Sequence, residues 1–414
     1  MTVFNPIWKV EIQGVEYTTY ILSNLTITSG RNNIYQQAQA GYCNIELINL
    51  NQAIVNININ DSVSISLQDS TSTFVPIFGG TVVDFGIEVV TAGSVGINQT
   101  LSITALGALS RLPKALTDGV LNQDYDGDQI WEVLQDLLLN NWGEVPAALT
   151  WASYDPTETW ATAENVGLGE IDRPGDYELA ARSSDRTDIY SLVAALATSG
   201  LGYIFEGPSG LISYADSTHR SQYFAANGYT EVTANQAIYN GFKIQTRAGD
   251  VRNDITLKYD TNGSSEVSAV DTDSITSYGR LAQIISTTVK SAIDAQSQAD
   301  FYLSLRATPQ ANLESITFQL TNPELDDGDR DSLINVFMGL PLLISDLPIN
   351  MGAIFQGFVE GWTFKAAYNE LAVTLNLSPV SFSLQAMKWE NVNPAESWNT
   401  ISGTLTWDTA LVVA

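Results

Sequence analysis

Apolar and polar residues alternate along much of the N-terminal part of the chain. Trp8, Val10 and Ile12 follow this pattern, and so do the apolar odd-numbered positions in 55–59, 63–67 and 101–105. A period of two places one face of a strand on a core and the other face in solvent. Thr, Ser, Asn and Gly dominate the intervening segments, as hairpin connections require. The pattern predicts an antiparallel barrel or sandwich over residues 1–112.

The middle of the chain, residues 113–240, changes to a mixed helical and strand pattern. A helical stripe follows the acidic segment 124–128, whose Asp126 or Asp128 is positioned to cap it. The stripe consists of Ile130, Val133, Leu134, Leu137 and Leu138. We expect a second helix over 188–199 and then two short strands, Tyr203–Glu206 and Leu211–Tyr214.

The pattern of alternation returns in the C-terminal third. Apolar residues alternate with polar ones over 316–320 and 371–377, and a long helix near 289–307 is predicted to stop before Pro309. The segment 261–273 is rich in Ser, Asn and Asp, so we expect a loop there. We therefore predict a second β domain over 241–385 and a short tail over 386–414. The predicted fold class is mainly β (α+β).

Charge and composition narrow the choice of function. The chain of 414 residues has 18 Lys and Arg against 46 Asp and Glu, a formal net charge of −28. Such a surface repels phosphate, so we expect neither specific nucleic-acid binding nor docking on anionic lipid. The N-terminal residues do not resemble a signal peptide. The apolar window 336–355 is interrupted by Pro341, Asp346 and Pro348, so we expect no stable membrane insertion.

Few residues in the sequence point to catalysis. Cys43 and His219 are the sole cysteine and histidine, which excludes disulfide scaffolds and sites built from several histidines. His219 lacks a G-x-S-x-G serine, and a solvent-facing or hydrogen-bonded loop histidine is the favoured interpretation. With 46 acidic residues, no carboxylate pair can be singled out for glycoside hydrolysis. No glycine-rich loop has the spacing of a phosphate-binding site. We therefore expect a protein without enzymatic activity and without a cofactor.

Two acidic segments, 124–128 and 326–331, are candidate calcium sites because hard cations prefer oxygen ligands. Neither completes a twelve-residue calcium loop. Capping explains the first segment, and a turn between strands explains Asp326, Asp327 and Asp329 in the second. We therefore expect no metal.

The tryptophans show an unusual spacing. Trp389, Trp398 and Trp407 are each nine residues apart, and so are Trp142, Trp151 and Trp160. One interpretation is that each tryptophan anchors a short segment to the body. The other is an adhesive strip that contacts another subunit or a sugar, because aromatic residues dominate interface energetics.

Several segments together resemble the tail hub proteins of long-tailed bacteriophages, also called baseplate hub or minor tail proteins. They are Phe78–Asp84 (FGGTVVD), Leu101–Leu112, the 188–199 helix with its two strands, Ser274–Arg280, and the tryptophan-rich end. The resemblance covers most of the chain and departs from the family over 142–185. None of these motifs is a catalytic signature.

The resemblance implies a homotrimer located at the virion tail tip and assembled in the host cytoplasm. Each subunit would supply two tail-tube-like barrels, 1–112 and 241–385, to a pseudo-sixfold ring through which DNA passes. Asp326, Asp327 and Asp329 are candidates for its acidic lumen. The implied partners are the distal tail protein, the tape measure protein, and receptor-binding or tail fibre proteins. A carbohydrate-binding adhesin and a cell-wall hydrolase remain alternatives.

Overall fold

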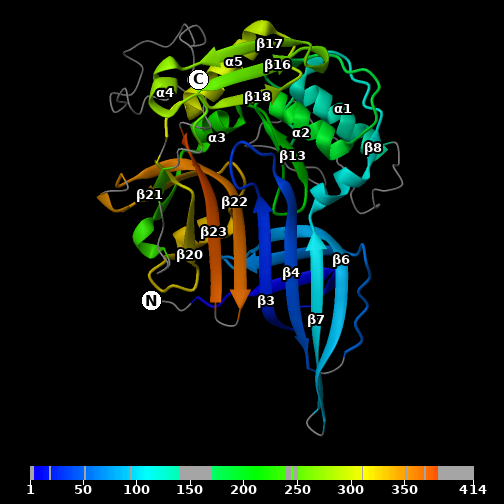
Figure 1. Ribbon diagram of the computed structural model, residues 1–414. Coiled ribbons are helices and arrows are strands. Elements are labelled where there is room, and N and C mark those ends of the chain that lie inside the picture. Colours follow the sequence, from blue (N-terminus) through cyan, green and yellow to red (C-terminus); the bar gives the residue numbers. More distant parts are fainter. Residues whose placement is uncertain are drawn as a thin grey trace.

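The computed structural model describes residues 4–17, 20–50, 53–93, 96–139, 170–237, 244–246, 250–309, 311–349, 352–367 and 370–380. Within these ranges the protein is mainly β, and the helices labelled in Figure 1 lie at one end of a large sheet. The predicted fold class is confirmed at this level. The predicted tail 386–414 lies outside the described residues.

One sheet of twelve strands forms the body of the molecule. Its strands run in the order β14-β21-β22-β3-β4-β7-β6-β5-β1-β2, while β23 pairs with β22 and β20 pairs with β23. All of its ladders are antiparallel except that between β14 and β21. The N-terminal strands are β1 (Trp8–Ile12), β2 (Val15–Glu16), β3 (Ile21–Gly30), β4 (Gln39–Asn49), β5 (Ser62–Gln68), β6 (Phe74–Gly93) and β7 (Gly96–Leu106). The others are β14 (Thr230–Thr233), β20 (Ser315–Gln319), β21 (Pro341–Ser345), β22 (Phe355–Ala367) and β23 (Glu370–Pro379).

Strands from the two ends of the chain join where β3 pairs with β22, from Gly30 opposite Gly361 to Asn24 opposite Ala367. Gly30 has φ +86°, and a Cβ there would overlap the Glu360 carbonyl oxygen. A Cβ on Gly361 would lie 2.7 Å from the Arg31 carbonyl oxygen. Only glycine fits these two positions without strain. The β3–β22 junction therefore depends on a pair of glycines.

The sheet is open rather than closed into barrels. Among the described residues, no ladder joins β1 or β2 back to β3, so the closed barrels that the sequence predicted are not seen. Beyond Val82, β6 pairs with β7 alone in the described part of the chain. This long β6–β7 hairpin projects away from the body in Figure 1. Along this hairpin, one edge of β6 therefore has no partner strand among the residues that the structure describes.

The predicted middle helices are both present. They are α1 (Asp126–Leu139) and α2 (Ile189–Ser199). Ile130, Val133 and Leu134 bury one face of α1, while Asp188 caps α2 by accepting a hydrogen bond from the Ser191 backbone at 2.8 Å. Nearby lie the turn η1 (Ala108–Lys114), β12 (Tyr203–Glu206), β13 (Ile212–Ala215) and α3 (His219–Asn227). Two small antiparallel ladders form here. One pairs β8 (Leu116–Thr117) with β11 (Thr187–Asp188), and the other pairs β9 (Asp124–Tyr125) with β10 (Glu178–Leu179).

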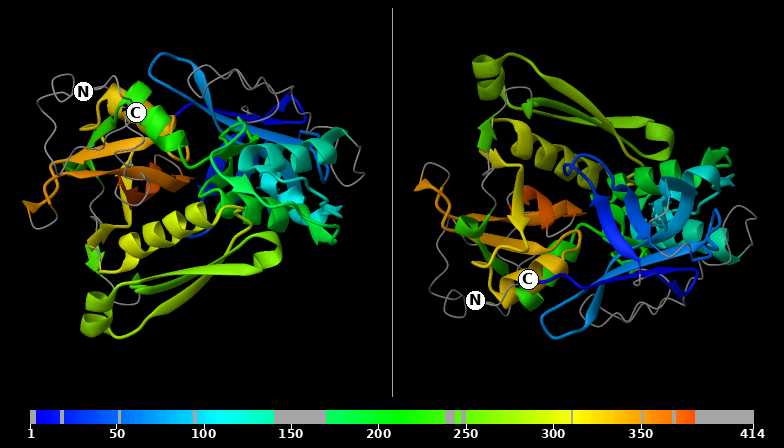
Figure 2. Two further views of the ribbon diagram at one scale, coloured as in Figure 1. Left: turned by 90° about the horizontal axis from the view of Figure 1, so that it is seen from above. Right: turned by 90° about the horizontal axis from the view of Figure 1, so that it is seen from below.

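A three-stranded sheet with one covering helix forms a separate layer. Its order is β17-β16-β18, and α5 lies between it and the rest of the molecule in Figure 2. The loop predicted for 261–273 is wrong: a short turn precedes β17, and Asp271 caps α4 by accepting from the Ser274 backbone at 2.8 Å. The elements are β16 (Asp254–Tyr259), β17 (Ser265–Val270), α4 (Thr272–Tyr278), β18 (Ala282–Ser286) and α5 (Ala292–Arg306). A further ladder joins β15 (Ile244–Thr246) to β19 (Ala311–Leu313).

The strand predicted at 55–59 does not form. The described residues 53–60 have no regular structure, and Ile57 is buried whereas Ile59 is exposed. The Asn58 backbone donates to the Asp61 side chain at 2.7 Å, and Asn60 has φ +72°. These local contacts favour a turn over a ladder.

A single large hydrophobic cluster spans the β strands and the middle helices. Cys43 is fully buried within β4, as predicted for a small core residue. Within the described ranges, none of the helices is long and apolar enough to cross a bilayer.

Candidate functional site

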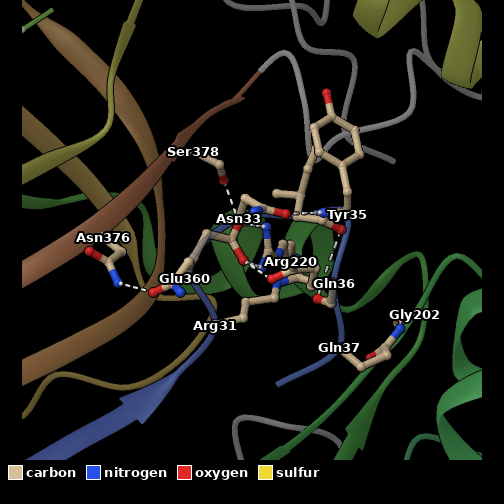
Figure 3. Close-up of polar contacts among 12 residues, drawn as sticks. Arg31, Asn33, Tyr35, Gln36, Gln37, Gly202, Arg220, Glu360, Asn376 and Ser378 are labelled. Atoms are coloured by element: carbon tan, nitrogen blue, oxygen red, sulfur yellow. Dashed lines mark hydrogen bonds and ion pairs between the residues drawn. The ribbon is translucent and has the colours of Figure 1, made fainter. Parts of the chain in front are cut away.

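Glu360 is a buried carboxylate where three parts of the chain meet. It lies in β22 at a shift of strand register, and its exposed fraction is 0%. Arg31, directly after β3, donates from Nε to Glu360 Oε2 at 2.6 Å. Arg220 in α3 donates to Oε1 at 2.8 Å and to Oε2 at 2.9 Å, and Ser378 Oγ also donates to Oε1. Figure 3 shows these side chains converging, and we call the four residues the Glu360 cluster.

In the Glu360 cluster, attraction between the carboxylate and the guanidinium groups stabilises the ionised form of Glu360. Burial alone raises the pKa of Glu360, but Arg220 and Arg31 outweigh it and lower that pKa to about 2. At Arg31, burial is the larger effect and lowers the pKa of the guanidinium. At Arg220, the attraction of the Glu360 carboxylate outweighs the effect of burial, so the pKa of Arg220 is raised. Because charged hydrogen bonds in a low-dielectric interior are strong, the carboxylate stays ionised at neutral pH.

Aromatic rings cover the positive side of the cluster. The guanidinium carbons of Arg220 and Arg31 lie 4.6 Å and 5.1 Å from the centre of the Tyr203 ring, and Arg220 also lies 5.1 Å from that of Phe358. Two guanidinium groups against one carboxylate leave an excess positive charge, which ring faces stabilise. A carboxylate with a pKa near 2 is a poor general base at neutral pH, so this arrangement fits a structural role.

Glu206 is a second buried carboxylate, at the end of β12. It accepts hydrogen bonds from the backbone of Gly41 in β4 and of Leu109 in η1, the latter at 2.9 Å. A Cβ on Gly41 or Gly107 would overlap this carboxylate. Burial raises the pKa of Glu206 to about 7, and the two backbone donors oppose that shift. Glu206 thus attaches the middle of the chain to the N-terminal strands.

Asp126, the third buried carboxylate, lies at the start of α1. It was predicted to cap that helix, but it accepts from the Tyr177 backbone at 2.8 Å and from the Tyr214 hydroxyl. Burial raises the pKa of Asp126 to about 7, although both hydrogen bonds lower it. Asp128, the other predicted cap, pairs instead with Arg173 at 2.5 Å. The segment 124–128 is thus engaged within the protein.

The acidic segment 326–331 begins a helix. The turn predicted for Asp326, Asp327 and Asp329 is therefore wrong, because α6 runs over Asp327–Ile334. Asp326 caps it by accepting from the Asp329 backbone at 2.8 Å, and Asp327 accepts from Arg330 at 2.7 Å. Burial and the neighbouring Asp326 raise the pKa of Asp329. Among the described residues, no group of three His, Cys, Asp or Glu could hold a metal ion.

His219 is the first residue of α3 rather than a loop residue. It is buried, and its Nδ1 lies 2.5 Å from Asp172 Oδ2. Of its two predicted states, hydrogen-bonded or solvent-facing, the structure shows the first. Trp389, Trp398 and Trp407 lie outside the described residues, so their two interpretations stay predictions.

The Glu360 cluster could not be assembled from the sequence. Arg31 lies 329 residues from Glu360, and Arg220 lies 140 residues from it. One signal was present: Glu360 is the sole charged residue within 355–364, an otherwise uncharged strand. A charge in such a strand indicates a buried partner of opposite sign.

Similarity to known proteins is visible in structure rather than in sequence. No family model matches the chain, and no curated protein matches it. The solved tail protein from Neisseria meningitidis MC58 superposes with a TM-score of 0.60 at 10% identity, covering 92% of this chain and 98% of that one. The 43 kDa tail protein of prophage MuSo2 from Shewanella oneidensis superposes with a TM-score of 0.56 at 11% identity, covering 91% and 99%.

The chain has the fold of phage tail proteins. The tail-protein fold extends over more than nine tenths of this chain in both comparisons. The resemblance inferred from the sequence motifs is confirmed as far as this fold.

Proposed function

We propose that this chain is a structural hub protein of a phage tail tip, three copies of which form a pseudo-sixfold ring. The observation that carries the proposal is the tail-protein fold over more than nine tenths of the chain. A fold can host several functions, so the role must also suit the features of this molecule.

The large sheet suits a ring subunit. Its N-terminal strands and its C-terminal strands lie side by side, joined through β3 and β22. In this proposal the N-terminal and C-terminal parts of the one sheet act as the two ring segments that each subunit of a pseudo-sixfold trimer must supply. The ring then closes through contacts between copies, and neither part needs to be a closed barrel by itself.

The charge suits a passage for DNA. With a net charge of −28, the surface presents few groups that would bind phosphate. Asp326, Asp327 and Asp329 are the lumen residues that we propose. A genome could then slide through the ring without adhering to it.

The remaining parts of the proposal concern position and partners. The ring would be assembled in the host cytoplasm and become part of the virion tail tip. It would contact a distal tail protein, a tape measure protein, and receptor-binding or tail fibre proteins. We propose no enzymatic activity, because Glu360, Glu206 and Asp126 serve to join elements. The tryptophan-based adhesin remains a prediction.

Imaging of the purified full chain tests the proposal. We expect mass photometry to detect a species of three times 44.9 kDa, and negative-stain class averages to show threefold symmetry around a central hole. A compact monomer at every concentration up to the solubility limit would contradict the ring. So would a species with twofold symmetry and no hole.

A further inference from the structure

A cavity beside the Glu360 cluster has the properties of a small-molecule site. It lies between the segment that follows β3, the end of α5, and the ends of β20 and β23. Its volume is about 380 Å³, within the range of roughly 300–1,000 Å³ that ligand pockets occupy. We call it the amide cleft, because the side chains of Asn32, Asn33 and Asn376 line it.

The lining of the amide cleft matches hydroxyl groups. A side-chain amide both donates and accepts hydrogen bonds, as a hydroxyl does, so the two can pair in either direction. Thr308 and Ser315 add hydroxyls of their own to the wall. Asn32 and Asn33 are exposed, and their amide nitrogens donate to no protein acceptor among the described residues. The cleft therefore offers donors that a ligand with several hydroxyls could engage.

An aromatic ring supplies the apolar wall. Tyr35 is 41% exposed, and its ring points away from the Glu360 cluster in Figure 3. The Arg306 guanidinium carbon lies 4.3 Å from the centre of that ring. Arg306 covers one face of this ring, so the exposed remainder of Tyr35 is the part that the apolar C–H face of a pyranose would contact.

The walls are held in place before any ligand arrives. Arg306 donates from Nη1 to Gln283 at 2.5 Å and from Nε to the Asp250 carbonyl at 3.0 Å. Asn33 Oδ1 accepts from the Tyr35 backbone at 3.0 Å, and Asn376 donates to Asn32 at 3.3 Å. Fixed walls lower the ordering cost of binding.

The charges of the cleft do not favour anions. Asp250 and Glu314 line it with two carboxylates and Arg306 with one guanidinium, while Arg252 lies close enough to act on Tyr35 and Arg306. These opposite charges balance, so the cleft has no excess of cations to attract phosphates or acidic sugars, and neutral hydroxyl groups are unaffected. We propose that the amide cleft binds a neutral saccharide of one or two pyranose units. This site goes beyond the ring proposal, because a ring needs no ligand there.

Saturation-transfer NMR on the full chain tests the proposal. The probes are two neutral disaccharides, cellobiose and N,N′-diacetylchitobiose, and the anion glycerol 3-phosphate. We expect at least one disaccharide to receive saturation with a Kd of about 1 mM or tighter, and glycerol 3-phosphate to receive none. Tyr35→Ala should weaken disaccharide binding at least about tenfold, because it removes the aromatic wall.

A matched control separates the cleft from nonspecific contact. Tyr42 is 40% exposed on β4 and does not line the cleft, so Tyr42→Ala should leave binding unchanged. Circular dichroism would verify that both variants fold. The proposal is overturned if neither disaccharide binds, if glycerol 3-phosphate binds better, or if both variants behave alike. None of these results would change the images that test the ring.

Discussion

The buried carboxylates Glu360, Glu206 and Asp126 differ in pKa because their hydrogen-bond donors differ. Glu360 receives two guanidinium groups, so its pKa falls to about 2. Glu206 and Asp126 accept only from backbone N–H groups or a tyrosine hydroxyl, so burial dominates and raises each pKa to about 7. Neutral donors offset less of the desolvation cost than cations do. Glu360 therefore contributes to stability in a different pH range from Glu206 and Asp126.

Replacing Glu360 by glutamine should strongly destabilise the protein. Two buried guanidinium groups would lose their counter-charge, and breaking a buried ion pair on one side costs about 3–5 kcal/mol. Urea unfolding of Glu360→Gln measures this loss. Glu370→Gln, an exposed position in β23, is the control and should change stability by less than about 0.5 kcal/mol. Equal effects of the two variants would contradict the structural role of the cluster.

Glu206 should make the protein less stable as the pH rises. Its folded pKa of about 7 exceeds the ordinary value of 4.5, so the folded state holds the proton more tightly than the unfolded state. Its contribution is complete below about pH 4.5 and is lost as the pH rises through 7, with an upper limit of about 3 kcal/mol. Glu360 has a folded pKa of about 2, so the change in its own contribution lies around and below the ordinary value of 4.5 and fades out towards pH 7.

Urea unfolding between about pH 5 and pH 8 measures the effect. Glu206→Gln cannot titrate, so its stability should fall less over this range than that of the parent chain, whatever its absolute value. Asp126 contributes a slope of the same sign in both proteins. Parallel pH profiles for the two proteins would contradict a raised pKa at Glu206.

At the scale of single elements, periodicity predicted the strands and helices that make long regular ladders or bury one face. The failures are local. Residues 55–59 alternate like a strand, yet contacts such as that between Asn58 and Asp61 favour a turn. Residues 265–270 are polar enough for a loop, yet they pair with β16 along their whole length. Asp326 marks a helix start, which a turn resembles in composition. Tertiary pairing decides such cases, and periodicity alone does not report it.

Gly79 in β6 should tolerate no side chain, unlike Gly86 in the same strand. A Cβ on Gly79 would overlap the Ser209 carbonyl in the β12–β13 turn, whereas nothing lies within 4 Å of a Cβ on Gly86. Gly79→Ala should therefore lower the free energy of unfolding by about 1–3 kcal/mol, because the turn must move. Gly86→Ala should be neutral or mildly stabilising. Chemical denaturation compares them, and an equal loss in both would show that the β6–turn contact is unimportant.

For the whole molecule, the sequence predicted a mainly β chain but not the joining of its two ends. The β3–β22 ladder pairs residues more than 330 positions apart, such as Gly30 and Gly361, and no local pattern encodes such a pairing. The same holds for the amide cleft, whose walls come from five separate segments. The property of the whole molecule that the sequence does determine directly is the net charge of −28.

Salt should favour the proposed ring. Copies with a net charge of −28 repel one another, and the Debye length falls from about 30 Å at 0.01 M salt to about 10 Å at 0.1 M. The trimer fraction in mass photometry should therefore rise with salt at constant protein concentration. A trimer fraction that falls with salt would mean that attraction between opposite charges holds the copies together.

The β3–β22 junction has a consequence for biosynthesis. β3 leaves the ribosome early, but its partner β22 ends at Ala367 and is among the last described strands to be made. During most of translation, one edge of β3 therefore lacks its native neighbour, and exposed strand edges promote aggregation. The N-terminal strands must wait until β22 has been made. Completion of the sheet is thus a late step, which delays assembly of a subunit until the segment through Ala367 has been synthesised.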